Sequence, residues 1–208
     1  IVSTFIEAVI APAVLPEAAP ILRTKGNMRV VTTDLSALAG ADRHAREVRS
    51  ILGALLVQQR DEVTEGRRAW PPAEGLKVVT KRAPSREEWQ ALRFAWRVMA
   101  HVKSNTVIFT TAHQTRAIGA GQMSRVDAVK VATMKAAGWD ATMTRPLAGT
   151  VAASDAFFPF RDGLDAVAAA GATAVIQPGG SVRDADVIAA ADEHGLAMVF
   201  TGRRHFRH

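Results

Sequence analysis

The last hundred residues alternate between short apolar runs and longer stretches with apolar positions at helical spacing. Four runs are expected to be strands, at 106–110, 150–153, 173–176 and 197–201. Helices are expected between them, beginning at Ser124, Asp162 and Ser181. Ser124 and Ser181 are each followed three residues later by Asp, a pattern typical of a capped helix start. This alternation predicts an α/β domain with a mainly parallel sheet covered by helices.

The start of the chain repeats this pattern on a smaller scale. An apolar run at 5–11 precedes a helical stretch at 16–23, which has proline at its start and a basic last turn. A Gly-Asn pair then leads into a strand-like run at 28–33. These elements predict one further α/β unit.

The middle of the chain has a looser pattern. The stretch from Ile51 to Leu56 is compatible with a helix. The charged residues 60–68 follow it and lead to Trp70-Pro71-Pro72, which we expect to be a rigid, poorly helical connector.

A well-marked helix is predicted after Pro84. Ser85, with Glu88 three residues later, is typical of a capping box, and the helix is expected to end near His101. Four large apolar side chains recur along it at helical spacing: Trp89, Leu92, Trp96 and Met99. This face packs either inside its own domain or against a partner subunit, and the first interpretation is favoured because amphipathic helices usually pack within their domain.

The loops that follow the strands are the expected place for a ligand, because ligands of α/β sheets bind beyond the carboxyl ends of strands. These loops are expected at 117–122, 154–161, 177–180 and 202–208. In the first, the Gly119-Ala120-Gly121 turn and Arg125 suit an anion. A dinucleotide fingerprint would need a third glycine where Ser124 stands, so a structural turn remains the favoured interpretation.

The loop from Ser154 to Asp162 concentrates unusual chemistry. It holds three of the eight Phe residues of the chain beside charged residues. Aromatic side chains with a carboxylate beside them suit a planar heterocycle that carries N–H donors. Core packing explains the Phe side chains equally well, and Asp162 is able to cap the following helix as well as bind a ligand.

Composition limits the classes of function. The net charge is +6, from 26 Lys and Arg against 20 Asp and Glu, which suits anionic ligands as well as an ordinary surface. The absence of Cys excludes disulfides and a cysteine nucleophile. No apolar run reaches the length of a membrane span, so we expect a soluble protein. The six His include no pair spaced for a metal-binding helix, and zinc-deaminase and Gly-x-Ser-x-Gly hydrolase motifs are missing, so no metal is expected.

Long motifs in five places make a family resemblance specific. They are His101 to Asn105, Ile118 to Arg125, Ala153 to Asp162, Ile176 to Ser181 and Arg204 to His208. Together they resemble the C-terminal part of the transformylase region of the bifunctional AICAR transformylase/IMP cyclohydrolase family of purine synthesis. The resemblance covers nearly all of residues 104–208 and extends more weakly to residues 5–31.

The resemblance implies a fold and a division of the chain. The family's transformylase region has two cytidine-deaminase-like α/β subdomains, layered from sheet and helices, without the zinc of the deaminases. One would be complete here and one partial. Residues 1–36 would be the remnant of the first subdomain, 37–103 a helical and connector region, and 104–208 the second subdomain. A cytoplasmic homodimer with shared active sites is also implied.

The resemblance further implies transfer of a formyl group from 10-formyltetrahydrofolate, the co-substrate, to AICAR. The residues that match AICAR-binding positions of the family are Asn105, Arg125, Phe157 and Arg204. Asn105 and Arg125 would contact the carboxamide region, with Asn105 in a supporting catalytic role, and Arg204 would lie near the phosphate. The residues that match the folate side are Pro159, Phe160 and Asp162, of which Asp162 would accept hydrogen bonds from the pterin.

The sequence departs from the family at the acid–base pair. The family uses adjacent Lys and His residues for proton transfer, and no Lys-His dipeptide occurs in this chain. We therefore expect the pair, and the cyclohydrolase domain, to belong to an N-terminal portion upstream of Ile1. The 208-residue chain would then hold much of the ligand pocket without being a competent catalyst by itself.

Two other classes of function remain open at this point. The chain would serve as a basic nucleotide- or nucleic-acid-binding module if its basic residues bound phosphates, but they lack interleaved stacking aromatics. The residues concerned are Arg67, Arg68, Lys77, Lys81, Arg82 and the basic C-terminus. The chain would alternatively serve as a dimerisation module through the helix after Ser85.

Overall fold

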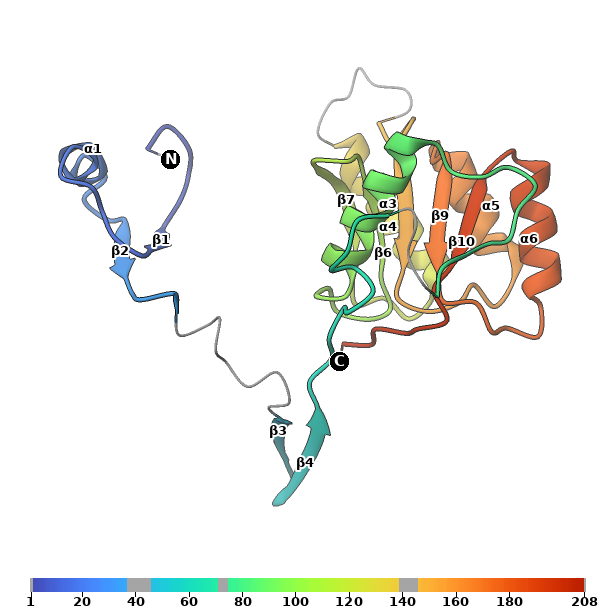
Figure 1. Ribbon diagram of the computed structural model, residues 1–208, viewed down its shortest axis with the longest axis horizontal. Coiled ribbons are helices and arrows are strands. Elements are labelled where there is room, and N and C mark those ends of the chain that lie inside the picture. The colour runs from blue at the N-terminus through green and yellow to red at the C-terminus, as the bar shows by residue number, and fades with distance from the viewer. Residues whose placement is uncertain (1, 37–45, 71–74, 139–145, 208) are drawn as a thin grey trace. The chain divides into compact units, whose positions relative to one another are not determined.

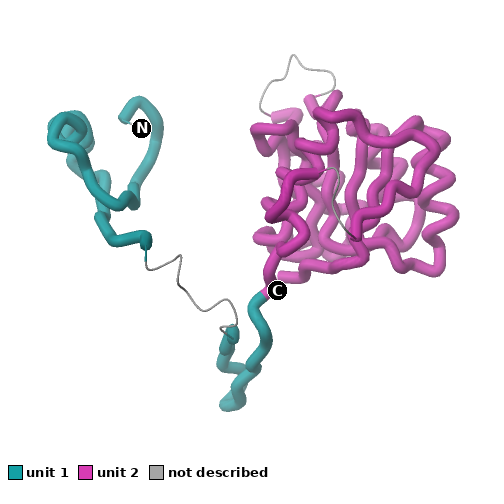
Figure 2. Tube along the Cα trace, in the orientation of Figure 1, with its two compact units in different colours: residues 1–60 teal, residues 61–208 magenta. Residues whose placement is uncertain are grey.

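The structure is a computed structural model that describes residues 2–36, 46–70, 75–138 and 146–207. The chain divides into two units, Ile1–Arg60 and Asp61–His208, each of which is described by itself (Figure 2). In the described part of the chain no helix is long and apolar enough to cross a membrane.

The first unit contains the small α/β motif that the start of the sequence predicts. Strands β1 (Ala8–Ala11) and β2 (Arg29–Thr32) pair in parallel, with Ala8 opposite Arg29, and helix α1 (Ala18–Arg23) connects them. The expected run of apolar, helical and strand-like segments is therefore confirmed here.

A β-hairpin occupies the stretch where a helix is expected from Ile51 to Leu56, so that prediction is wrong. Strands β3 (Arg46–Ile51) and β4 (Ala54–Gln59) pair antiparallel. Leu52 and Gly53 form the two-residue connection and both have positive φ, 47° and 84°. Two-residue loops of this kind fit the twist of paired strands, and this turn takes precedence over the apolar spacing that suggested a helix.

The second unit is built on a six-stranded sheet in the order β5-β10-β9-β8-β6-β7 (Figure 1). Its strands are β5 (Lys77–Val78), β6 (Val107–Thr110), β7 (Thr115–Gly119), β8 (Val151–Ser154), β9 (Ala174–Gln177) and β10 (Ala197–Phe200). The four strands expected in the last hundred residues are confirmed within one residue at each end. The part of the connector at residues 71–74 lies outside the described residues.

The sheet is mixed, whereas a mainly parallel sheet is expected. β8, β9 and β10 run parallel, β6 is antiparallel to both of its neighbours, and β5 is antiparallel to β10. β7 falls where a loop is expected from residue 117 onward. Its half-exposed Thr115 and Arg116 make it a polar edge strand, which gives a weak apolar pattern.

Helices cover both faces of the sheet (Figure 1). Helix α3 (Arg86–Met99) packs on one face, and helices α4 (Arg125–Ala137), α5 (Arg161–Ala170) and α6 (Asp184–Glu193) pack on the other. Successive strand residues point to opposite faces, so Val107 and Phe109 join one core while Ile108 joins the other. The expected α/β class is confirmed.

The helix starts follow the capping patterns closely. Ser85 and Glu88 form the expected capping box of α3, and Ser124 caps α4 by accepting from the Asp127 amide. Helix α6 begins at Asp184, three residues after the expected start at Ser181. Leu92, Trp96 and Met99 of α3 are fully buried against the sheet, which confirms that this face packs within its own domain.

Candidate functional site

An arginine is held at the carboxyl end of strand β8 by a buried carboxylate. Arg125 opens helix α4, and its Nη2 lies 3.2 Å from Oδ1 of Asp155, which immediately follows β8. Its Nε donates to Ser154 Oγ at 3.2 Å and to the Ala156 carbonyl at 3.3 Å. The side chains of Arg125 and Asp155 are 12% and 0% exposed. Three acceptors therefore fix the direction of the guanidinium.

Asp155 and Arg125 each keep one polar atom that makes no hydrogen bond among the described residues. Asp155 Oδ2 is buried and has no hydrogen bond in the described part of the structure. Among the same residues, no hydrogen bond involves Nη1 of Arg125. Burial lowers the pKa of the Arg125 guanidinium although Asp155 opposes this, and the positive charge of Arg204 lowers it further. A ligand atom that accepts a hydrogen bond from Nη1 would stabilise the charged form of the Arg125 guanidinium.

Asn105 lies beside Arg125 because its side chain binds the turn that leads into α4. Its Nδ2 donates to the carbonyls of Gln122 at 3.0 Å and Met123 at 3.1 Å. The backbones of Asn105 and Gln122 also exchange hydrogen bonds. Both amide protons face carbonyl oxygens, so Oδ1 is the atom of this carboxamide that remains to bind a ligand, as an acceptor.

Arg204 and Phe157 complete this group of residues. The guanidinium carbon of Arg204 lies 4.9 Å from the centre of the Phe157 ring. This is a cation–π contact, and Phe157 follows Asp155 by only two residues. The structure therefore brings the four expected AICAR-side residues together at the carboxyl end of β8 and the start of α4.

The three expected folate-side residues lie on the surface around the start of α5. Pro159, Phe160 and Asp162 are exposed, with Phe160 54% exposed and 5.3 Å from the guanidinium carbon of Arg183. Asp162 lies in the first turn of α5 and accepts from the Gly163 amide at 2.7 Å. The N-cap position belongs to Phe160, so Asp162 does not cap the helix from that position.

The aromatic loop divides between core and surface. Phe158 is fully buried, packs close to Gly163, and its amide donates to Gln177 Oε1 at 2.9 Å. Phe157 is half-buried and Phe160 is exposed. The interpretation as core packing therefore holds for Phe158 alone.

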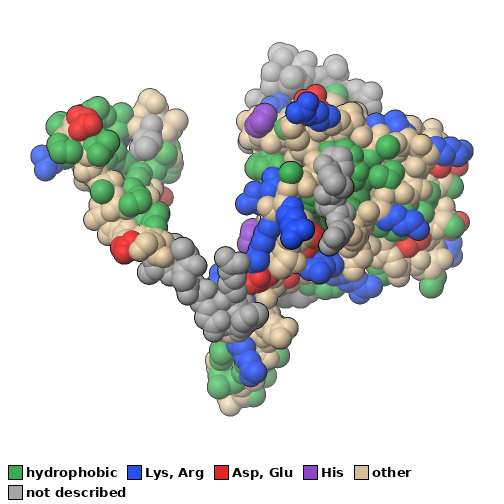
Figure 3. All heavy atoms as spheres, viewed as in Figure 1, with side chains coloured by type: hydrophobic (Ala, Val, Ile, Leu, Met, Phe, Trp, Pro, Cys, Tyr) green, Lys and Arg blue, Asp and Glu red, His purple; other side chains and the backbone are tan. Residues whose placement is uncertain are grey.

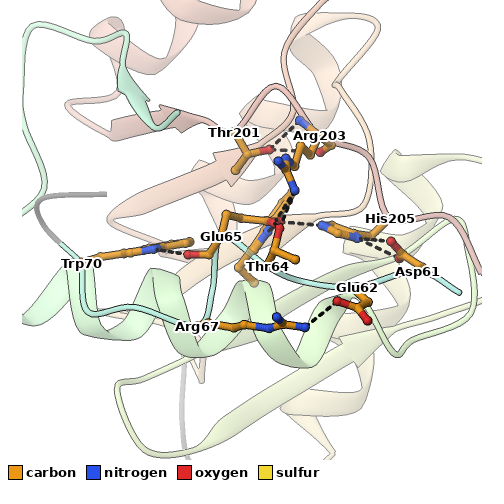
Figure 4. Close-up of polar contacts among 10 residues, drawn as sticks. Asp61, Glu62, Thr64, Glu65, Arg67, Trp70, Thr201, Arg203 and His205 are labelled. Atoms are coloured by element: carbon orange, nitrogen blue, oxygen red, sulfur yellow. Dashed lines mark hydrogen bonds and ion pairs between the residues drawn. The ribbon is translucent and has the colours of Figure 1, made fainter. Parts of the chain in front are cut away.

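A charged network that the motifs do not identify joins the C-terminal segment to the start of the unit (Figure 4). His205 is buried, and its Nδ1 lies 2.8 Å from Asp61 Oδ2 while its Nε2 lies 2.6 Å from Glu65 Oε1. Trp96 Nε1 donates to the same Glu65 oxygen at 2.6 Å. Asp61 and Glu65 lie in the charged run 60–68, where nothing in the sequence pattern indicates a partner near the end of the chain.

The two buried members of this network have shifted pKa values. Burial alone would raise the pKa of Glu65, but hydrogen bonds from His205 and Trp96 outweigh it and lower the pKa to about 2. Burial alone would lower the pKa of His205, but hydrogen bonds to Glu65 and Asp61 outweigh it and raise the pKa. His205 is therefore favoured as an imidazolium.

We expect the contribution of this network to stability to be complete between pH 4.5 and pH 6.5, the ordinary pKa values of Glu65 and His205. Glu65 has a lowered folded pKa, so its contribution is lost as the pH falls from 4.5 towards its folded pKa. His205 has a raised folded pKa, so its contribution is lost as the pH rises through that value. Urea denaturation of the wild type and of His205→Gln across this range measures both losses.

The variant serves as the control for the alkaline side, because it lacks the titrating imidazole. A wild type whose stability falls no more steeply above pH 6.5 than that of His205→Gln would contradict the assignment. Asp61, Glu65 and the Arg203 guanidinium, 3.4 Å from Glu65 Oε2, are the charged groups of the network that both curves share.

A cavity of about 480 Å³ lies elsewhere in the second unit, around the start of α3. Arg82 on its wall is already bound to Glu88 at 2.8 Å and to the carbonyls of Thr173 and Gly195. None of the residues expected in the site lines it, so we place the site at the Arg125 group. Among the described residues, no group of His, Cys, Asp and Glu is arranged to hold a metal ion.

The nucleic-acid interpretation finds little support. Arg67 pairs with Glu62 at 2.5 Å, and Arg82 is bound as described above. On the face drawn in Figure 3, Lys and Arg side chains of the second unit lie in separate groups with acidic and apolar side chains between them. A phosphate backbone is normally bound by a continuous basic surface with exposed stacking aromatics.

A layered α/β domain with arginines, an amide and an aromatic ring at its strand ends is typical of enzymes that bind small anionic substrates. Comparison with known proteins gives the family. Residues 1–135 match the model of the AICARFT/IMPCHase bienzyme family, and the chain belongs to that family. The resemblance found in the sequence motifs is thereby confirmed.

Several bacterial relatives match almost the whole chain. The bifunctional purine biosynthesis protein PurH of Myxococcus xanthus is 52% identical over 208 residues, which are 99% of this chain and 38% of the relative. The PurH proteins of Mesorhizobium japonicum and Chloroflexus aurantiacus are 54% and 53% identical, over 100% and 98% of this chain. The chain spans 38% and 37% of the length of those two relatives.

Proposed function

We propose that the protein takes part in the transfer of a formyl group from 10-formyltetrahydrofolate to AICAR, the ribonucleotide of aminoimidazole carboxamide, in purine (IMP) synthesis. The observation that carries the proposal is the group in which Arg125, Phe157 and Arg204 meet beside Asn105. Family membership supports it, because the matched relatives are bifunctional purine biosynthesis proteins.

The free atoms of the site complement a carboxamide. A carboxamide has one carbonyl oxygen that accepts and one amino group that donates. Arg125 Nη1 is available to donate to the oxygen, and Asn105 Oδ1 is available to accept from the amino group. Asn105 thereby supports catalysis by orienting the substrate, and the two residues hold the carboxamide in one plane beside the reacting amine.

The remaining residues of the group complement the rest of the nucleotide. We place the phosphate near Arg204, whose guanidinium suits a phosphate because its N–H groups match two phosphate oxygens. The Phe157 ring offers an aromatic surface beside it for the imidazole. The charge of Arg204, which lowers the pKa of Arg125 and has no ion pair among the described residues, would be neutralised by the phosphate dianion.

We place the pterin of the folate against Pro159, Phe160 and Asp162. Phe160 presents an exposed ring for stacking, on the face that Arg183 does not contact. Asp162 uses Oδ1 to accept from the Gly163 amide, so its other oxygen is available to the N–H groups of a pterin. Their position in the loop that also carries Phe157 supports placing the two substrates next to each other.

The reaction needs proton transfer that this chain does not supply. The AICAR amine forms a bond to the formyl carbon and loses a proton, while the bond from that carbon to the folate nitrogen breaks and this nitrogen gains a proton. The family's Lys-His pair fits these steps, and the chain has no Lys-His dipeptide. The 208 residues bind and orient both substrates, and catalysis requires acid–base groups from outside them.

We extend the proposal to the finer fold and to the assembly. The layered sheet of the second unit supports a cytidine-deaminase-like subdomain that contains 104–208 and also, through β5 and α3, part of the region 37–103. Residues 1–36 would belong to a first subdomain. We place the protein in a cytoplasmic homodimer with shared sites. The β3–β4 hairpin, which exposes Leu52, Leu55 and Val57, supports a contact with a second chain. The cyclohydrolase activity resides in a part of the whole protein outside these residues.

Titration calorimetry tests the proposal. We expect AICAR to bind the 208-residue chain, and Arg204→Gln to weaken this binding about tenfold or more because it removes the cation near the phosphate. Arg161→Gln is the matched control, since it removes an equal charge from an exposed ion pair with Asp165. Equal affinity of wild type and Arg204→Gln for AICAR would contradict the assignment.

Turnover is measured separately. A chimera in which these 208 residues replace the matching segment of the Myxococcus xanthus relative supplies the rest of the enzyme. We expect the chimera to formylate AICAR and the 208-residue chain to bind AICAR and a folate analogue without turnover. Formylation by the isolated chain at the rate of the chimera would overturn the assignment of the proton-transfer pair.

A further inference from the structure

His205 lies between two carboxylates in a manner that requires both of its ring nitrogens to donate. Nδ1 is 2.8 and 2.9 Å from the two Asp61 oxygens, and Nε2 is 2.6 Å from Glu65 Oε1. Carboxylates only accept, so the neutral ring, which has a single N–H, would leave one contact between two acceptors. His205 is 2% exposed, and its ring meets Trp96 edge-on at 5.3 Å between ring centres.

The contacts around His205 anchor the segment that carries Arg204. The His205 amide donates at 3.3 Å to the backbone carbonyl of Asp155, the residue whose carboxylate pairs with Arg125. Further along, Ser104 and Arg207 exchange two hydrogen bonds, of 2.8 and 3.0 Å, beside Asn105. The segment 203–207 is therefore bound on one side by the site and on the other side by Asp61 and Glu65.

This segment carries three arginines, of which Arg203 is bound to Thr64 and Glu65. Arg203, Arg204 and Arg207 are all exposed, and Arg204 lies close enough to lower the pKa of Arg125. Like charges repel, so Arg204 needs contacts that hold it near Arg125. Asp61 and Glu65 on the facing segment 61–65 offset part of that charge, and in the described part of the chain His205 is the side chain that contacts both.

We propose that His205 is a positioning residue, which as an imidazolium between Asp61 and Glu65 fixes segment 203–207 so that Arg204 lies over Phe157 and meets the phosphate of the nucleotide. The role in nucleotide binding rests on the proposed function. His205 itself touches no substrate and acts through Arg204.

A double-mutant cycle tests this action. We expect His205→Gln to weaken AICAR binding to the 208-residue chain about tenfold, and to change the affinity for a folate analogue less than about twofold. In an Arg204→Gln background, His205→Gln should weaken AICAR binding less than about twofold, because Arg204, through which His205 acts, is already absent. The riboside of AICAR, which lacks the phosphate, should bind wild type and His205→Gln alike.

A second pair of variants keeps the test valid if His205→Gln does not fold. Asp61→Asn removes one carboxylate at a half-exposed position and should weaken AICAR binding about threefold. Glu62→Gln is its matched control, because Glu62 pairs with Arg67 and does not contact His205. Equal effects of these two variants on AICAR binding would overturn the proposal.

Hydrogen exchange separates the anchoring from the proposed function. Amides of residues 203–207 should exchange faster in His205→Gln than in wild type, whether or not a ligand is present. Unchanged exchange there overturns the anchoring role. Faster exchange with unchanged AICAR affinity overturns the role of His205 in nucleotide recognition. Equal losses of AICAR affinity from His205→Gln in the wild-type and Arg204→Gln backgrounds also overturn it. A wild type that binds no AICAR instead overturns the proposed function.

Discussion

Arg125→Met is expected to destabilise the second unit by about 3 kcal/mol or more, because it leaves a fully buried carboxylate without its cation. Asp155 is 0% exposed, its Oδ1 is paired with Arg125, and its Oδ2 already lacks a partner. Methionine fills a similar volume, so the lost charge rather than a cavity dominates the effect. Urea denaturation at neutral pH, with the slope of the transition compared between proteins, measures the change.

Two further variants show where this energy comes from. Adding Asp155→Asn to Arg125→Met should recover about half of the loss, because a neutral amide costs less to bury unpaired than a carboxylate does. Arg161→Met, which breaks the exposed pairs with Asp165 and Glu193, should cause little measurable change. If Arg125→Met proves as stable as Arg161→Met, the buried pair does not hold the end of β8.

Gly119→Ala is the second substitution with a large expected effect, a loss of about 3 kcal/mol or more. A Cβ added at Gly119 would overlap the backbone carbonyl of Ala128, because strand β7 and helix α4 approach each other at this point. Backbone atoms cannot move aside as a flexible side chain does, so the strand and the helix would have to separate. Thermal and urea unfolding of the variant check the prediction.

The control is Gly138, which follows the last residue of α4, the helix that Gly119 approaches. Gly138 has φ of −73°, and among the residues that the structure describes a Cβ there meets nothing closer than 3.5 Å. Gly138→Ala should therefore be neutral or stabilise by about 0.5 kcal/mol, through the unfolded state. A variant Gly119→Ala with wild-type stability would mean that α4 does not lie so close to β7.

The parts of the fold that follow from local chemistry were predictable. Ser85 with Glu88, and Ser124 with Asp127, satisfy amides at their own helix starts, so the sequence alone locates α3 and α4. The hairpin at 46–59 was missed, because Leu52 adopts a positive φ that its residue type does not favour. Strand β7 was missed because an edge strand with one polar end shows no apolar alternation.

The same distinction between predictable and unpredictable features applies to the site residues. Asn105, Arg125, Phe157 and Arg204 came from motif resemblance, and the structure adds the contacts that bring them together. The role of Asn105 Oδ1 as the free atom depends on which carbonyls surround its amide, which no motif reports. The contact of His205 with Asp61 and Glu65 joins positions about 140 residues apart, a separation at which residue spacing carries no information.

The edge-on contact of Trp96 with His205 makes Trp96 an internal probe of that histidine. The indole donates to Glu65 and lies against the imidazole, so its emission depends on the electric field of that ring. Any event that withdraws the histidine, whether a change in acidity or a released chain end, changes the light that this one tryptophan emits. In a variant that keeps Trp96 and replaces the other three of the four Trp residues, the fluorescence of the protein would therefore follow movements of the C-terminal segment.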